Sequence, residues 1–324
     1  MSKILVSGVK PTGRVHIGNY FGAMKQFVDL QDQYDCKIFI ADYHALTTVQ
    51  DKEALKQGII DVALDYLAIG VDPKKVTLFK QSDVPQVTEL TWFFNTLTTV
   101  PYLERAHAYK DAIAKGQEAN VGLFDYPILM ASDILIADAD VVPVGQDQKQ
   151  HIEYARDTVQ KFNNAYGETF KQPEALILEQ VETVPGTDGR KMSKSYNNVI
   201  PLFATDEEIK KAVMSIPTDS KGVDEAKDPD ESHLFAIHKL FLDAAGVNAL
   251  RAKYENGGVG YKDLKETLIA DVSAFIAPLR EKRELLAQDL DTVLEILKEG
   301  GERARHDAER KMKEVREKVG LEIY

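Results

Sequence analysis

The chain has 324 residues, 44% of them hydrophobic, so it is long enough to bury a large core and to form two domains. Its formal net charge of −12 argues against a protein that coats nucleic acid non-specifically, although a local basic surface would still allow one folded RNA to dock. The single cysteine, Cys36, excludes an internal disulfide and a cysteine-rich zinc or iron–sulfur site, and we expect no metal site built by the protein alone.

The amino terminus leads directly into a short apolar run that predicts a strand. No run of about 18 apolar residues follows anywhere in the sequence. We therefore expect neither a signal peptide nor a membrane span, and a cytoplasmic location.

Short apolar runs alternate with segments of helical periodicity in the first part of the chain. Strands are expected at residues 4–6, 38–41, 76–79 and 141–144, and helices at residues 20–30, 52–67 (ending at Gly70), 103–116 and 127–136. This alternation predicts an α/β fold with a Rossmann-like parallel sheet and a ligand cleft at the carboxyl ends of the strands. Ser7, Gly8 and Lys10 come just past the expected end of the first strand and are expected to line that cleft.

Beyond residue 198 nearly the whole chain has helical patterns. They cover residues 207–214, 233–245, 264–286 and 291–318, and the expected interruptions are Pro229, Gly246, Gly257-Gly258 and Gly300-Gly301. We therefore expect a Rossmann-like domain at residues 1–198, with a helical insertion at about residues 103–136, and a helical domain at residues 199–324.

The turn between the first strand and the first helix is a candidate phosphate site. It reads Pro11-Thr12-Gly13-Arg14-Val15-His16-Ile17-Gly18-Asn19. Free backbone N–H groups at the helix start, near Gly18 and Asn19, attract anions, and the side chains of His16 and Asn19 add donors for phosphate oxygens. An ordinary turn into an amphipathic helix explains these residues equally well when they are taken alone.

A second candidate phosphate segment, Lys191-Met192-Ser193-Lys194-Ser195, follows the turn-forming residues 185–190. Two lysines three residues apart with a serine between them can direct two ammonium groups and a hydroxyl to one polyphosphate. A solvated basic loop is the alternative for this segment alone. The presence of both segments in one α/β chain favours ATP-driven activation, and Gly186 and Gly189 predict a mobile loop that closes over the nucleotide.

The last predicted helix, residues 302–318, carries seven basic and five acidic side chains. Such a helix is usually a solvated face with paired side chains, and contact with RNA is the second interpretation.

The two phosphate segments together resemble the paired motifs of class I aminoacyl-tRNA synthetases. A third stretch resembles the bacterial tryptophanyl-tRNA synthetases in particular; it comprises Phe124-Asp125-Tyr126-Pro127-Ile128-Leu129-Met130-Ala131-Ser132-Asp133-Ile134-Leu135 and Val142-Pro143-Val144-Gly145-Gln146-Asp147-Gln148-Lys149-Gln150-His151. The resemblance runs over nearly the whole chain and is weakest in the helical carboxyl-terminal part. It implies activation of tryptophan by ATP with Mg²⁺, transfer to tRNA, a homodimer, a tRNA-binding role for residues 199–324, and neither DNA nor a membrane as partner.

Asp133 supports tryptophan as the substrate on physical grounds as well. It lies in an apolar stretch three residues after Met130, on the same helical face. The tryptophan indole has one N–H donor and no acceptor, so an acceptor-only carboxylate beside a thioether suits it. The alternatives are that Asp133 faces solvent or caps a backbone group, and that the acceptor serves the phenol of tyrosine.

The resemblance assigns further roles by position. It implies catalytic roles for His16, Asn19, Lys191 and Lys194. It implies ATP contacts for Lys10, Pro11, Thr12, Gly18, Asn19, Lys110, Gly145, Gln146, Asp147, Val184, Lys191, Met192, Ser193, Lys194 and Ser195. It implies tryptophan contacts for Ser7, His44, Tyr126, Met130, Asp133 and Gln148, with Tyr126 and Gln148 at the amino group.

Four positions depart from the family pattern. Lys10 stands where many bacterial members have glutamine, His16 where many have threonine, Ala112 where a second triphosphate-binding lysine is common, and Val6 where an aromatic residue is usual. We hypothesise that Lys10 supplies the charge that Ala112 lacks. A tyrosine-specific synthetase and a non-catalytic RNA-binding paralogue remain the alternative functions.

Overall fold

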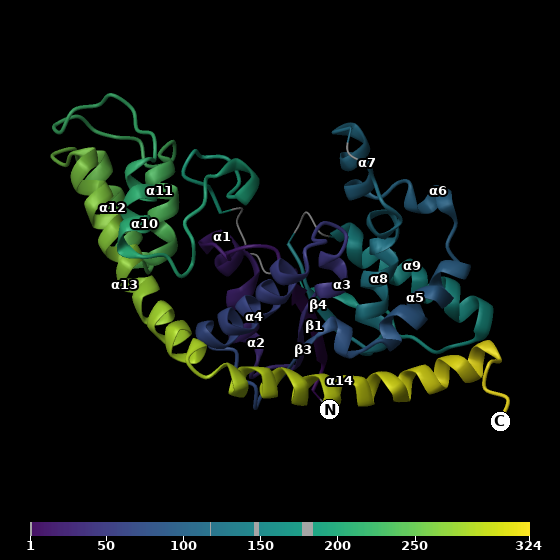
Figure 1. Cartoon of the computed structure of the whole chain (residues 1–324). Helices are drawn as coiled ribbons and strands as arrows, with labels where there is room; N and C mark the ends of the chain where they lie inside the picture. The colour runs from purple at the N-terminus through teal and green to yellow at the C-terminus, as the bar shows by residue number, and fades with distance from the viewer. Residues whose placement is uncertain (1, 117, 146–148, 177–183) are drawn as a thin grey trace. The chain divides into compact units, whose positions relative to one another are not determined.

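A computed structural model describes residues 2–116, 118–145, 149–176 and 184–324 (Figure 1). The chain forms two compact units: the first spans Met1–Gly13, Gln26–Leu178 and Asp289–Tyr324, and the second spans Arg14–Lys25 and Glu179–Gln288. These units do not coincide with the boundary expected after residue 198, because residues 14–25 pack with the later part of the chain and residues 289–324 with the earlier part. The assignment of catalytic and tRNA-binding domains concerns function and stays a prediction.

A parallel five-stranded sheet forms the centre of the first unit, and it confirms the predicted Rossmann-like α/β fold. Its strands are β1 (Ile4–Val9), β2 (Asp35–Ile40), β3 (Val76–Lys80), β4 (Val141–Pro143) and β5 (Glu174–Leu176), in the spatial order β3-β2-β1-β4-β5. The chain continues to one side of β1 with β2 and to the other side with β4. This change of direction opens a ligand crevice beside the carboxyl end of β1.

Local signals explain where the helices of the first unit begin and end. Helix α4 (Lys52–Ile69) starts where the Asp51 carboxylate accepts the backbone N–H of Ala54 at 2.7 Å, and it ends, as predicted, at Gly70 with φ 108°. Helix α8 (Val121–Ile136) begins six residues earlier than expected, because the Asn120 side chain caps the backbone N–H of Leu123 at 2.8 Å. Pro127 lies inside this helix instead of starting it.

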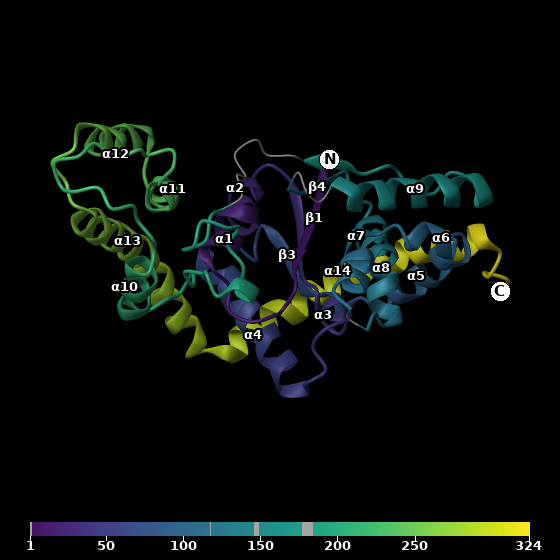
Figure 2. The same cartoon turned by 90° about the horizontal axis from the view of Figure 1, so that it is seen from above.

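The remaining helices of the first unit complete its layers. They are α2 (Lys25–Leu30, which begins on the last residue of the second unit), α3 (Asp42–Ala45), the 3₁₀ turn η2 (Gln81–Asp83), α5 (Gln86–Thr96), α6 (Val100–Leu103), α7 (His107–Ala114), α9 (Lys149–Tyr166) and α14 (Leu290–Val319). Helices α5, α8 and α9 lie side by side (Figure 2). Phe94 on α5, Phe162 on α9 and Phe170 in the segment after α9 pack edge to face.

The long helix α14 contradicts one prediction, because it runs unbroken through Gly300 and Gly301. The helix crosses β3 so closely that a Cβ atom added at Gly300 would overlap the backbone carbonyl oxygen of Leu78. The two glycines therefore allow close packing of helix on strand instead of ending the helix. The expected break at Gly246 is also wrong. Gly246 lies in the first turn of α12 (Ala244–Asn256), because the Asp243 side chain caps this helix and accepts the Gly246 N–H at 2.8 Å.

Several basic residues of α14 are engaged inside the first unit. The Arg316 guanidinium pairs with Glu89 and Glu309, and Lys311, 8% exposed, pairs with Asp138 and Glu314 at 2.9 Å each. Glu89 and Asp138 lie outside α14, so these pairs attach the helix to the rest of the unit. The expected paired side chains are present, but at Lys311 the helix is buried and not solvated. Contact with RNA stays a prediction.

The second unit is helical around the two phosphate segments. It contains α1 (Ile17–Asn19), the π-helical turn η1 (Tyr20–Met24), the 3₁₀ turns η4 (Lys194–Tyr196) and η5 (Lys239–Phe241), α10 (Asp206–Met214), α11 (His233–His238), α12 and α13 (Tyr261–Ala287). Tyr20, Phe21, Phe241 and Phe275 form an aromatic cluster that packs η1 against α13. In the part of the chain that the structure describes, no helix is long and apolar enough to cross a membrane.

The close crossing of α14 and β3 makes a stability prediction. We expect Gly300→Ala to lower the free energy of unfolding by about 2 kcal/mol or more, because the added methyl group has to displace backbone. Gly22→Ala is the matched control, since a Cβ there meets nothing within 4 Å, and it should change stability by less than about 1 kcal/mol. Denaturant unfolding measures both values. Equal stability of the two variants would contradict the tight packing.

Candidate active site

The crevice beside β1 contains a cavity of about 450 Å³ in the first unit. Its apolar wall comes from the ends of three strands and from α8. The lining residues include Val6, Phe39, Leu123, Met130, Ile134, Val142, Val144 and Ile152. A predominantly apolar cavity of this size with a few polar groups fits a small aromatic ligand.

Asp133 is the carboxylate of this cavity. It is 6% exposed on α8, one turn after Met130, and both side chains line the cavity as their spacing predicted. Gln81 Nε2 lies 2.9 Å from each Asp133 carboxylate oxygen, and His44 Nε2 lies 3.1 Å from Oδ2. The alternatives in which Asp133 faces solvent or caps a backbone group are therefore wrong.

The surroundings of Asp133 act on its protonation in opposite directions. Burial raises the pKa of the carboxyl above its ordinary value, and the hydrogen bonds and charge from His44 and the hydrogen bond from Gln81 oppose this rise. A carboxylate has about four acceptor sites, so these neighbours leave room for one more donor from a ligand.

Further polar side chains line the cavity from α8, α9 and the segment after β1. The hydroxyl of Tyr126 lies 2.7 Å from Nε2 of His151, and burial raises the pKa of Tyr126 to about 12, so the phenol keeps its proton. The ammonium of Lys10 lies 5.7 Å from the centroid of the Tyr126 ring. Ser7, at the carboxyl end of β1, completes the polar lining.

The second unit contains a separate hollow of about 300 Å³ between the two phosphate segments. Its lining residues are His16, Gly18, Asn19, Val184, Lys191, Met192, Ser193 and Lys194. Backbone hydrogen bonds join the first segment to the chain just after the second one, because Ile17 N–H donates to the Ile200 carbonyl at 3.0 Å and Leu202 N–H donates to the Val15 carbonyl at 3.0 Å. A Cβ atom added at Gly18 would lie 3.2 Å from the Cβ of Met192, so glycine permits this close approach.

His16 enters this hollow as a neutral imidazole. Burial, with a smaller contribution from the Lys194 charge, lowers the pKa of His16 to about 4. Its Nδ1 is buried without a hydrogen-bond partner among the residues that the structure describes. The Asn19 side chain accepts the backbone N–H of His16 at 3.1 Å and fixes the start of α1. Two exposed ammonium groups and a neutral imidazole beside one hollow are suited to a polyphosphate.

Asn198 organises the loop that carries the lysines. Its Oδ1 accepts the N–H of Ser193 at 2.7 Å, and its Nδ2 donates to Asp188 at 2.6 Å and to the Lys191 carbonyl at 3.2 Å. The hydrogen bond from Asn198 and the charge of Arg190 lower the pKa of Asp188 to about 2. These contacts give the loop an internal structure, and its closure as a unit stays a prediction.

Comparison with known proteins identifies the family. The family model described as tRNA synthetases class I (W and Y) matches residues 2–299. The chain belongs to this family of synthetases. The tryptophan–tRNA ligase of Fusobacterium nucleatum is 53% identical over 317 residues, which cover 98% of this synthetase and 97% of that protein. The tryptophan–tRNA ligase of Rhodopirellula baltica is 50% identical, covering 98% and 99% of the two chains.

Solved structures agree with this assignment. The tryptophanyl-tRNA synthetase of Campylobacter jejuni, complexed with ADP and tryptophan, has a TM-score of 0.91 and 47% identity over 98% of this synthetase and 100% of that chain. The enzyme of Mycoplasma pneumoniae has a TM-score of 0.82 and 29% identity over 99% and 98% of the two chains.

Most of the predicted site residues of the synthetase line one of the two hollows. Ser7, Lys10, His44, Tyr126, Met130 and Asp133 surround the larger one. Lys110 is exposed on α7 and lines neither hollow, and Pro11, Thr12, Gly145 and Ser195 flank the lining segments without being part of them. Gln146, Asp147 and Gln148 lie outside the described residues.

Sequence reasoning missed Gln81 and did not assign His151 a role. Gln81 directly follows the last residue of β3, so the carboxyl-end rule that selected Ser7 would have found it on the third strand. The described residues hold no group of three His, Cys, Asp or Glu side chains arranged for a metal ion.

Proposed function

We propose that this synthetase is a tryptophan–tRNA ligase, which activates L-tryptophan with ATP and transfers it to tRNA. The observation that carries the proposal is the buried Asp133 carboxylate in an apolar cavity, where the single N–H of an indole finds an acceptor. The ring itself packs against Met130 and the strand ends.

In the proposed first step, a carboxylate oxygen of tryptophan attacks the α-phosphorus of ATP. The bond from that phosphorus to the oxygen bridging to the β-phosphate breaks, and pyrophosphate leaves with the charge. The product is tryptophanyl-adenylate. A ribose hydroxyl at the tRNA terminus then attacks its carbonyl carbon, and AMP leaves. The protein contributes mainly by orienting the reactants and stabilising charge.

Lys191 and Lys194 would neutralise charge that develops on the phosphates, and Mg²⁺ would arrive bound to ATP as part of the substrate. His16 and Asn19 would add neutral donors. Lys10 would replace the lysine that is absent at Ala112, since Ala112 is buried on α7 and has no side chain that reaches a phosphate.

We also propose roles that rest on the family resemblance. Tyr126 and Gln148 would hold the amino group of tryptophan, and Gly145, Gln146 and Asp147 the ribose of ATP. Val184 would touch the adenine. Residues 199–324 would bind the tRNA, and the enzyme would act as a homodimer in the cytoplasm.

The alternative is specificity for tyrosine, because a phenol O–H also donates to a carboxylate. Pyrophosphate exchange with each amino acid separates the two. We expect exchange with tryptophan to exceed exchange with tyrosine by more than about a hundredfold. A ring that misfits the cavity loses packing contacts, and it also loses the hydrogen bond to Asp133. Equal rates would contradict the proposed specificity.

The same assay tests the carboxylate itself. Asp133→Ala should raise the KM for tryptophan by at least roughly tenfold, because the hydrogen bond to a charged acceptor is lost. Asp125→Ala is the matched control: Asp125 lies on the same helix, bonds to Asn95 at 2.8 Å and lines neither hollow. The control should keep the wild-type KM. If Asp133→Ala kept the wild-type KM for tryptophan, the proposed role of this carboxylate in tryptophan recognition would be contradicted.

The lysine loop makes a separate prediction. Lys194→Ala should slow tryptophan-dependent pyrophosphate exchange by on the order of a hundredfold, as expected when one charge-stabilising donor is removed, while ground-state binding of ATP changes less. Lys210→Ala, an exposed lysine on α10 of the same unit, should leave the rate unchanged. A near wild-type rate for Lys194→Ala would refute the role of this lysine.

A further inference from the structure

Gln81 is buried behind Asp133, and the two side chains share the wall of a small internal cavity next to the proposed tryptophan-binding cavity. It is 1% exposed and uses both ends of its amide. Its Nε2 donates to both oxygens of Asp133 at 2.9 Å, and its Oε1 accepts the backbone N–H of His44 at 3.3 Å. The backbone N–H therefore fixes which end of the amide faces the carboxylate.

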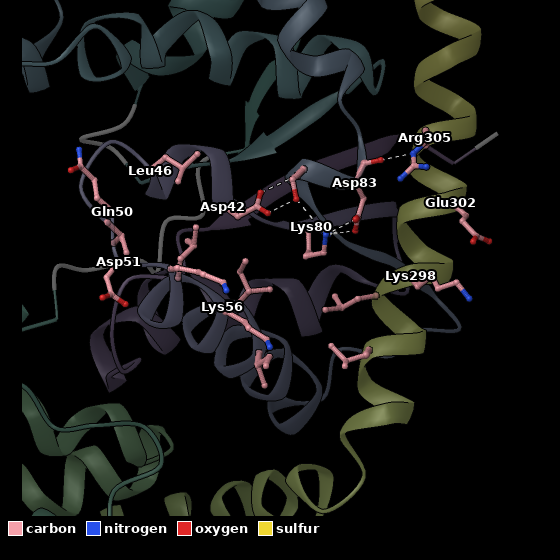
Figure 3. Close-up of a pocket in the computed structure, with 18 residues that line it drawn as sticks. Asp42, Leu46, Gln50, Asp51, Lys56, Lys80, Asp83, Lys298, Glu302 and Arg305 are labelled. Carbon is pink, nitrogen blue, oxygen red and sulfur yellow. Dashed lines mark hydrogen bonds and ion pairs between the residues drawn. The ribbon is translucent and has the colours of Figure 1, made fainter.

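Hydrogen bonds and an ion pair hold the 3₁₀ turn η2, which carries Gln81, in place. Ser82 N–H donates to Asp42 at 2.9 Å, and the Ser82 hydroxyl donates to the same carboxylate. Lys80 pairs with Asp83, whose carbonyl accepts Nε of Arg305 at 2.6 Å. Figure 3 shows Asp42, Lys80, Asp83 and Arg305 together along one wall of a groove of about 760 Å³.

These contacts place two short segments, α3 and η2, in one rigid arrangement. Each segment reaches the groove, α3 with Asp42 and η2 with Ser82 and Asp83. Each also has one residue bonded to Asp133, which is His44 in α3 and Gln81 in η2. The orientation of the carboxylate is therefore set by neighbours that do not depend on a ligand.

We propose that Gln81 is a positioning residue for tryptophan recognition: it keeps the Asp133 carboxylate ionised and oriented with an acceptor site open to the indole N–H. Gln81 spans both carboxylate oxygens and so prevents rotation of the group. It stabilises negative charge as a neutral donor, so no cation competes with the ligand for the same oxygen. This inference rests on the proposed activation of tryptophan.

The electrostatic surroundings of Asp133 have to be kept constant in a test. The titratable or charged side chains that act on it or share a cavity wall with it are Asp42 and His44 on α3, Lys37 on β2 with its partner Asp307 on α14, and Lys10, Tyr126 and His151 around the larger cavity. A change at Gln81 alone leaves all of them in place.

The experiment compares wild type, Gln81→Leu and Gln81→Glu in pyrophosphate exchange at several pH values. Gln81→Leu should raise the KM for tryptophan roughly 10- to 100-fold with much smaller changes in kcat and in the KM for ATP, because a hydrogen bond to a charged group is lost equally from ground and transition states. Without the donor the Asp133 pKa rises further, so the loss of tryptophan affinity on acidification should begin at a higher pH than in wild type.

Gln81→Glu keeps the size of the side chain and tests donation directly. Two ionised carboxylates this close repel each other, whereas the introduced carboxyl group, once protonated, donates to Asp133. The KM of this variant for tryptophan should therefore fall as the pH is lowered, opposite to the trend for Gln81→Leu. A purely structural role of Gln81 gives no such inversion.

Gln31→Leu is the matched control, since Gln31 also uses both ends of its amide, to the Gly70 carbonyl at 3.2 Å and the Asp72 N–H at 2.9 Å, away from the cavity. It should keep the wild-type KM. If wild type fails to exchange pyrophosphate with tryptophan, the proposed function is wrong. If wild type is active and both Gln81 variants keep its KM and pH profile, the positioning role alone is overturned.

Discussion

The buried charge of Asp133 is the constraint on which the first unit depends. A carboxylate in an apolar wall is costly unless donors surround it, and α3 and η2 supply those donors from the ends of two strands. Helix α3 follows β2 and the turn η2 follows β3 at the carboxyl edge of the sheet. From there each element brings one side chain, His44 or Gln81, to the Asp133 carboxylate. The pocket is therefore specific through polarity as well as shape.

The second unit carries the groups that we propose bind the negative charge of the nucleotide. Its two phosphate segments lie far apart in the sequence, and backbone hydrogen bonds join residues 15–17 of the first to residues 200–202, which follow the second. Both lysines of the loop are exposed, and Asn198 gives the loop a defined internal structure. The lowered pKa of His16 keeps its imidazole neutral, so it adds no positive charge beside Lys194.

Much of this organisation could be predicted from the sequence, because it follows from local patterns. The period of apolar residues indicated the parallel strands, and the spacing of Met130 and Asp133 indicated one helical face. The failures have two physical causes. Local side-chain caps by Asn120 and Asp243 set the starts of α8 and α12, and tertiary contacts decided the other cases. Gly300 has the local character of a helix break, yet its role is set by β3 passing beside it, and Gln81 has no local signal beyond its place after a strand. A hydrogen bond between residues that are distant in sequence, such as Ile17 and Ile200, produces no periodic pattern of apolar residues from which it could be predicted.

The most direct test of the account is a crystal structure of the protein with L-tryptophan and a non-hydrolysable ATP analogue. We expect the indole nitrogen to lie about 2.7–3.2 Å from a carboxylate oxygen of Asp133, with Gln81 still bonded to both oxygens. A ring bound elsewhere, or an Asp133 side chain turned to solvent, would contradict the central claim.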